Sequence, residues 1–105
     1  FLGRFVLPKP GEGPSEKDQK NGFYDFRFVG TTEDGREIRT KVLGDRDPGY
    51  GSTAKIIGQA AVCLAQDVSS DVKGGFWTPA TIMGDKLIDR LNAYSGVTFE
   101  VLENK

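Results

Sequence analysis

The strongest constraint on the fold is a pair of segments that alternate apolar and polar residues and are joined by a glycine turn. The first segment covers residues 24–29 and the second residues 36–43. Period-two alternation of this kind is typical of β-strands with one solvated face. Between them, Gly35 can take positive φ and Asp34 can hydrogen-bond the local backbone. The pattern predicts an antiparallel hairpin whose inward side chains are Tyr24, Phe26, Phe28, Ile38, Thr40 and Val42.

A helix is expected after the hairpin. Asp47 and Pro48 suit an N-cap and a first-turn proline, because proline fixes φ and needs no amide partner. Apolar residues then recur at steps of four and three, which indicates a helical stripe that packs into the core. The stripe consists of Tyr50, Ala54, Ile57, Ala61, Leu64 and Val68, and it is widened by Ile56, Ala60 and Cys63.

A second helix and a third strand complete the pattern. Thr78 and Pro79 repeat the cap signal, and apolar residues continue at helical spacing as far as Tyr94. Gly96 suits a left-handed residue that ends the helix. The last segment alternates through Val97, Phe99 and Val101, which predicts a strand.

The predicted order is therefore ββααβ, an α+β fold. We expect a two-layer sandwich in which an antiparallel sheet of about three or more strands has two helices on one face.

Residues 1–22 are rich in proline, glycine and charge, so a loop or linker with a short apolar start at Phe5-Val6-Leu7 is expected there. Residues 23–105 form the single predicted domain. The chain begins at Phe1, without an initiator Met, and is expected to be an excerpt of a larger protein.

Composition excludes several functional classes. The 105 residues contain no histidine, so a Ser-His-Asp or Cys-His arrangement cannot form. The net charge is −1 with both signs intermixed, and this argues against nucleic acid as a partner. No apolar run is long enough to predict a membrane span. The single cysteine, Cys63, excludes an intrachain disulfide, and a reduced, cytoplasmic setting is expected.

Residues 49–54 formally fit the G-x-G-x-x-G/A pattern of dinucleotide-binding turns. The fit requires a buried parallel strand directly before the turn, whereas the predicted strand is amphipathic and residues 44–48 intervene. No second strand follows the helix either. We therefore expect these small residues to allow close packing of the helix, and we expect no cofactor and no metal to be bound by this chain.

Six residues near predicted loops and helix starts are candidates for a substrate cleft: Arg46, Asp47, Tyr50, Lys55, Trp77 and Thr78. Arg46 is suited to bidentate contact with a carboxylate or phosphate, although residues 45–47 equally suit helix capping. Trp77 suits a core edge, a pocket or a domain interface. For Tyr50 a packing role is favoured over an acid or orienting role. No catalytic residue is assigned.

Four sequence islands together resemble the C-terminal region of saccharopine dehydrogenase-like oxidoreductases, in the branch of trans-acting enoyl reductases. The islands are Lys9 to Ser15; Gly44 to Tyr50 with Thr53-Ala54-Lys55; Thr78-Pro79-Ala80; and Met83-Gly84-Asp85 with Leu87-Ile88 and Arg90-Leu91. The resemblance implies a parent protein whose N-terminal Rossmann domain, missing from this chain, binds NAD(P). It also implies that this domain helps to form the cleft for a small-molecule substrate and a possible homodimer interface. A non-catalytic dimerisation or interaction module is the alternative.

Overall fold

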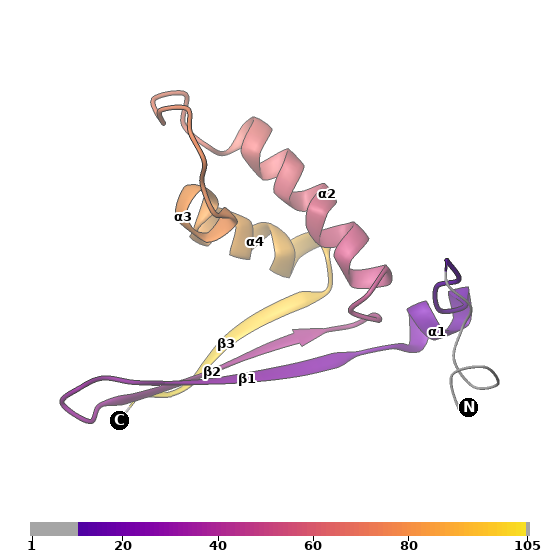
Figure 1. The fold of residues 1–105 in the computed structure, drawn as a ribbon, viewed down its shortest axis with the longest axis horizontal. Helices are drawn as coiled ribbons and strands as arrows, with labels where there is room; N and C mark the ends of the chain where they lie inside the picture. The colour runs from indigo at the N-terminus through magenta and orange to yellow at the C-terminus, as the bar shows by residue number, and fades with distance from the viewer. Residues whose placement is uncertain (1–10, 105) are drawn as a thin grey trace.

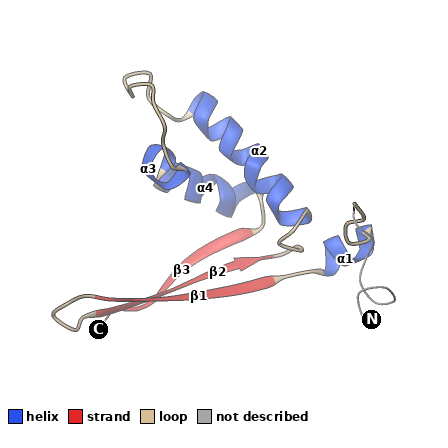
Figure 2. Ribbon diagram, viewed as in Figure 1, coloured by secondary structure: helices blue, strands red, loops and turns tan. Residues whose placement is uncertain are grey.

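The computed structural model describes residues 11–104. It contains four helices and three strands within that range (Figures 1 and 2). In chain order they are α1 (Glu16–Asn21), β1 (Tyr24–Thr31), β2 (Glu37–Gly44), α2 (Gly51–Gln66), α3 (Pro79–Met83), α4 (Asp85–Tyr94) and β3 (Val97–Asn104). The strands form one antiparallel sheet in the order β1-β2-β3. The predicted α+β class is confirmed.

The strand register separates the sheet into an apolar and a charged face. Phe26 pairs with Val42, which pairs with Phe99, so these three side chains share one face. We call this the apolar sheet face; its members are Tyr24, Phe26, Phe28, Ile38, Val42, Val97, Phe99 and Val101. The opposite face carries ion pairs, including Arg27–Asp25 at 2.9 Å and Lys41–Glu100 at 2.7 Å.

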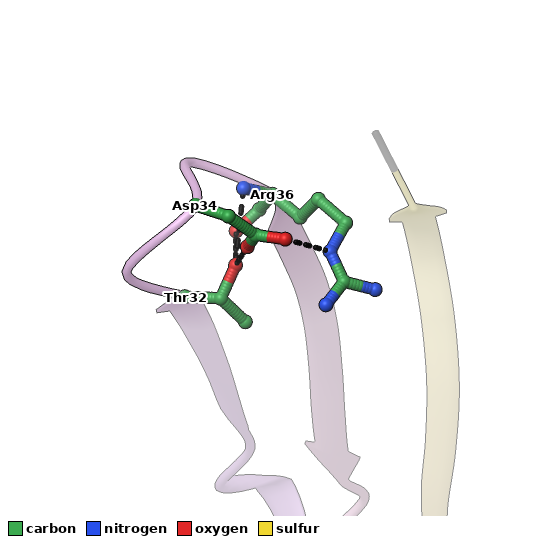
Figure 3. Close-up of polar contacts among 3 residues, drawn as sticks. All are labelled: Thr32, Asp34 and Arg36. Atoms are coloured by element: carbon green, nitrogen blue, oxygen red, sulfur yellow. Dashed lines mark hydrogen bonds and ion pairs between the residues drawn. The ribbon is translucent and has the colours of Figure 1, made fainter.

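The predicted turn between β1 and β2 is confirmed. Gly35 has φ 83°, and its N–H donates to the carbonyl of Thr32 at 2.9 Å. Asp34 contacts the Thr32 hydroxyl and accepts from Arg36 Nε at 2.9 Å, while the Arg36 N–H donates to Thr32 Oγ1 at 3.1 Å (Figure 3). These contacts fix the tip of the hairpin.

The helices cover only one end of the sheet. Helices α2 to α4 lie on one side of it, near the start of β3, and the hairpin extends beyond them (Figure 1). The fully packed apolar side chains gather at this junction: Cys63, Met83, Leu91 and Val97. Phe28 and Val101 are 54% and 63% exposed, although their pattern predicted an inward position. That prediction was wrong for the outer part of the apolar sheet face, because nothing in residues 11–104 covers it.

Helix α2 turns most of its predicted apolar stripe outward and only one edge of it inward. The apolar stripe that was expected to pack inward faces outward, with Ile57 68% and Leu64 53% exposed. Ser52 and Cys63 are buried, so the edge of the predicted stripe formed by Cys63 and the half-buried Ile56 and Ala60 does pack inward. Two polar contacts hold this orientation, because Ser52 Oγ lies 2.8 Å from the Tyr24 hydroxyl and the Lys55 ammonium donates to a carbonyl of the α4–β3 turn.

The second predicted helix is divided into α3 and α4. Gly84 adopts φ 50° and ψ −133°, outside helical geometry, and this breaks the continuous helix that the apolar spacing predicted. Thr78 caps α3 as predicted, and its Oγ1 accepts from the Thr81 N–H at 3.3 Å. Gly96 has the expected positive φ, 70°.

The segment predicted as a loop contains α1. Ser15 caps it by accepting from the Asp18 N–H at 3.2 Å, and the carbonyl of Gln19 accepts from the Asp47 N–H at 3.1 Å. The reading of 1–22 as loop is therefore wrong for residues 16–21. The predicted apolar start, Phe5 to Leu7, lies outside the described residues.

Candidate functional site

Asp47 lies at the junction between β2 and α2. The N-cap of α2 is Tyr50 and the helix begins at Gly51, so the prediction of Asp47 as N-cap and Pro48 as first-turn proline was wrong. The Asp47 carboxylate accepts from the backbone N–H groups of Gly49, Tyr50 and Gly51 at 3.0, 3.1 and 2.6 Å. These bonds, that of Gly51 first, lower the pKa of Asp47 below its usual value. A carboxylate held ionised in this way is a weak general base, so a structural role in fixing the turn before α2 describes Asp47 best.

The same bonds decide whether the turn at residues 49–54 fits a dinucleotide. A pyrophosphate would need the free N–H groups at the start of α2. Those of residues 49–51 donate to the Asp47 side chain, and the Ser52 N–H donates to the Asp47 carbonyl at 2.9 Å. In addition, β2 pairs antiparallel with both of its neighbours. The turn does not fit a nucleotide, and we derive no step through one here.

Lys55 and Arg46 lie at the same junction but differ in what they contact. Lys55 Nζ donates to the Ser95 carbonyl at 3.3 Å and lies 3.8 Å from Asp45 Oδ1, so it ties α2 to the α4–β3 turn. Arg46 is half-buried, and its Nε–H finds no acceptor within residues 11–104. The Arg46 Nε is buried as well as unpaired, so this donor is not open to a ligand in the present arrangement.

Trp77 lies at the other end of α2, in the wall of a pocket of about 590 Å³. Its indole N–H donates to the Lys73 carbonyl at 3.1 Å, which orients the ring. Leu64, Val68 and Met83 contribute to the same largely apolar wall. Of the roles considered for Trp77, a place in a pocket wall agrees with this geometry. The neighbouring Thr78 uses its hydroxyl to cap α3, as described above.

The structure divides the six candidate cleft residues into two groups. Arg46, Asp47, Tyr50 and Lys55 gather at the first turn of α2, whereas Trp77 and Thr78 follow its last turn. A helix of 16 residues is roughly 24 Å long. One copy of the chain therefore does not bring the two groups to a common site.

A second apolar pocket, of about 410 Å³, lies between α4 and β3. Leu87, Ile88, Leu91 and Phe99 line it, and Phe99 also belongs to the apolar sheet face. Sequence analysis assigned these residues to helix and strand packing and missed the pocket. Their spacing predicted apolar faces, but it carried no information on how far apart the helix and strand lie.

A charged cluster joins the end of α2 to α4. Arg90 contacts Asp67 through two nitrogens, one at 3.0 Å, and Lys86 Nζ donates to the Asp67 carbonyl at 2.6 Å. The Arg90 guanidinium lowers the pKa of Asp67. Burial raises the pKa of the adjacent Cys63 thiol, and its hydrogen bond to Asp67 adds to the shift. The thiol is fully buried, and a thiol shielded in this way is unreactive.

Neither a metal site nor a membrane span is found in the described part of the chain. Residues 11–104 contain no group of three or more histidine, cysteine, aspartate or glutamate side chains that could hold a metal ion. None of the helices in that range is both long enough and apolar enough to cross a bilayer.

Curated proteins named trans-acting enoyl reductases are similar to this chain. A provisionally named trans-acting enoyl reductase of Mycobacterium tuberculosis (strain H37Rv) is 39% identical over 101 residues, which are 94% of this chain and 24% of that protein. Trans-acting enoyl reductases of Mycobacterium bovis and Mycobacterium ulcerans are 41% and 39% identical over 88 residues, 82% of this chain and 21% of each protein. The chain is homologous to a segment of each. It spans between a fifth and a quarter of their length.

These relatives support the enoyl reductase part of the resemblance seen in the sequence. No family model matches the chain. No solved structure matches it either. The saccharopine dehydrogenase-like relationship and the nicotinamide cofactor stay predictions.

Proposed function

We propose that this chain is the substrate-side domain of an NAD(P)-dependent enoyl reductase of the saccharopine dehydrogenase-like type. On this proposal the other parts of the polypeptide bind the nucleotide and pack on the apolar sheet face. Two findings support it: the relatives are named enoyl reductases, and the chain corresponds to a quarter or less of their length. The catalytic unit then needs residues beyond these 105.

The apolar sheet face is the observation that carries the proposal. Phe26, Phe28 and Val101 are each more than half exposed on this face, with Thr40 of the central strand between Phe28 and Val101. Contiguous apolar surface of this kind marks an interface or a binding groove. The opposite face of the same sheet bears ion pairs and suits water. The sheet therefore has one solvated face and one that needs a covering layer.

The chemistry of enoyl reduction fits a polypeptide in which one part binds the nucleotide and this chain contacts the substrate. A hydride adds to the β-carbon of a carbon–carbon double bond conjugated with a carbonyl, and a proton adds to the α-carbon. A reduced nicotinamide would supply the hydride when it is bound. This chain would contribute apolar walls that hold the acyl part and exclude water, such as the Leu87, Ile88 and Phe99 pocket. Arg46 is the candidate polar group for contact with a substrate oxygen, through its terminal guanidinium nitrogens, because its Nε is itself buried.

The alternative is a non-catalytic dimerisation or interaction module. The outward apolar stripe of α2 favours it, since a helix with such a face packs against another element. The two roles are compatible, because substrate-side domains can also carry a subunit interface.

Calorimetric titration with NADPH separates the two proposals. The natural polypeptide that contains residues 1–105 is expected to bind NADPH, whereas the 105-residue chain alone is expected to show no binding heat. The Asp47→Ala variant of the chain is the matched control, because it frees the amides of α2 that a pyrophosphate would need. Binding of NADPH by the unaltered chain, or no binding by the natural polypeptide, would contradict the proposal.

A further inference from the structure

The segment between α2 and α3 leaves one aromatic side chain wholly in solvent. Phe76 is fully exposed, whereas its neighbour Trp77 is held by the hydrogen bond from its indole N–H to the Lys73 carbonyl. In Figure 1 the segment between α2 and α3 projects beyond both helices. Burial of a phenylalanine ring is favourable wherever an apolar surface lies within its reach.

Such a surface lies directly beside Phe76. Gly75 and Trp77, the residues on either side of it, both line the pocket of about 590 Å³ described above. Three apolar side chains in the wall of that pocket, those of Leu64, Val72 and Trp77, are each more than a third exposed. Phe76 therefore starts at the rim of an open and mainly apolar pocket.

The residues inside the loop that the Trp77–Lys73 hydrogen bond closes are held by no bond of their own. Gly74, Gly75 and Phe76 make no hydrogen bond with any residue in the range 11–104. Gly74 is not among the positive-φ glycines of that range, and a Cβ built on it meets no atom within 4 Å, so the present arrangement does not require glycine there. Glycine allows large changes of φ and ψ, as a hinge needs. Phe76 can therefore turn over without breaking any hydrogen bond of the loop.

We propose that Gly74-Gly75-Phe76 is a lid whose closed state places the Phe76 ring in this pocket, against Trp77. The structure holds the lid in its open state. Closure shields Trp77 and Leu64 from solvent, so an apolar group that enters the pocket has to displace the ring. Both the lid and the pocket belong to this chain, and the lid closes whatever reaction the protein catalyses.

The connection through the chain makes Phe76 the favoured occupant of the pocket. The Trp77–Lys73 hydrogen bond keeps both ends of the short loop beside the pocket, so the ring never leaves its neighbourhood. A group tethered in this way has a high effective concentration at its site, which a separate segment or molecule has to exceed.

Disulfide trapping tests the closed state. Leu64 and Ile57 both lie on the outward side of α2 and are more than half exposed, but only Leu64 lines the pocket. They are two helical turns apart, roughly 10 Å along the axis. Phe76→Cys combined with Leu64→Cys should form an intramolecular disulfide under mild oxidation. The matched pair, Phe76→Cys with Ile57→Cys, should do so at least about tenfold less, because its two Cβ atoms cannot come close enough in the closed lid.

Mass spectrometry identifies the linked residues in the 105-residue chain and in the natural polypeptide that contains it. Native Cys63 is fully buried and should not compete for either disulfide. Equal linkage of the two pairs, or no linkage of the first pair, would overturn the proposal. Linkage in the 105-residue chain but not in the natural polypeptide would also overturn it, because another part of that polypeptide would then fill the pocket.

The fluorescence of Trp77 gives a second measurement, since it is the single tryptophan of the 105-residue chain. Phe76→Ala should raise the acrylamide quenching constant of Trp77 by about twofold, because a lid that is closed most of the time shields the indole. Phe23→Ala is the matched control and should leave the quenching unchanged, since Phe23 is also largely exposed but does not line the pocket. Circular dichroism checks that each variant is folded. Equal quenching in the unaltered chain and in the Phe76→Ala variant would show that the lid does not close.

Discussion

Two valines on β3 give a matched test of the uncovered sheet face. Val97 and Val101 belong to the same strand and the same face, but Val97 is 2% exposed and Val101 is 63% exposed. Valine to alanine removes two methylene equivalents, worth about 0.8 kcal/mol each when fully buried, and a buried site adds a cavity cost. Val97→Ala should therefore lower the free energy of unfolding by about 2–3 kcal/mol. Val101→Ala should lower it by only about 0.6 kcal/mol in the 105-residue chain.

The assay is urea unfolding followed by circular dichroism. In the natural polypeptide that contains residues 1–105, the cost of Val101→Ala should rise to about 1.5 kcal/mol or more, because the covering layer buries that side chain. Val97→Ala should cost the same in both settings. Equal costs for the two variants in the isolated chain would refute the description of the face as uncovered. A negligible cost for Val101→Ala in the natural polypeptide would refute the proposal that the polypeptide covers it.

Three further predictions follow from single contacts. Gly96→Ala should destabilise the chain by about 1–2 kcal/mol in urea unfolding, because Gly96 has positive φ and a Cβ there would lie 2.1 Å from Asp45 Oδ2; an unchanged midpoint would contradict this. The pKa of Asp67 is lowered by Arg90, so their interaction should stabilise the fold fully above the unfolded pKa of about 3.9 and be lost as pH falls through the lower folded value. Asp67→Asn should therefore flatten the acid side of the stability–pH curve, and an unchanged slope there would argue against it. Cys63 is fully buried and burial raises the pKa of its thiol, so maleimide labelling should proceed only as fast as the chain unfolds; rapid labelling of the folded chain would exclude this burial.

The strands of the sheet were predictable because each is specified by residues that are close together in the sequence. Alternation identified the strands, and Gly35 and Gly96 occupy the positive-φ positions that their neighbours indicated. Thr78 caps a helix for the same reason. Two local features escaped prediction. Helix α1 is only six residues long and has no apolar repeat, and Gly84 breaks a spacing that otherwise reads as one helix.

The burial of α2 could not be predicted from its pattern. A stripe such as that of Ile57 and Leu64 shows that a helix has an apolar face, but it does not identify the surface that covers it. Sequence reasoning placed that surface inside this chain, whereas the structure turns only the Cys63 edge of the stripe inward, together with Ser52. The candidate site was limited in the same way. Trp77 was recognised as a possible pocket residue, but its separation from Arg46 depends on the length and direction of α2.

The most direct test of the central claim compares two neighbouring residues of β1 in an enzyme assay. Phe28 and Val29 are 54% and 60% exposed, but they lie on opposite faces of the sheet. The natural polypeptide that contains residues 1–105 would be assayed for NADPH oxidation with an α,β-unsaturated acyl thioester. Phe28→Asp should abolish the reduction, because it places a charge on the apolar face, and Val29→Asp should leave it nearly unchanged. Equal activity in the two variants, or no reduction by the unaltered polypeptide, would contradict the account.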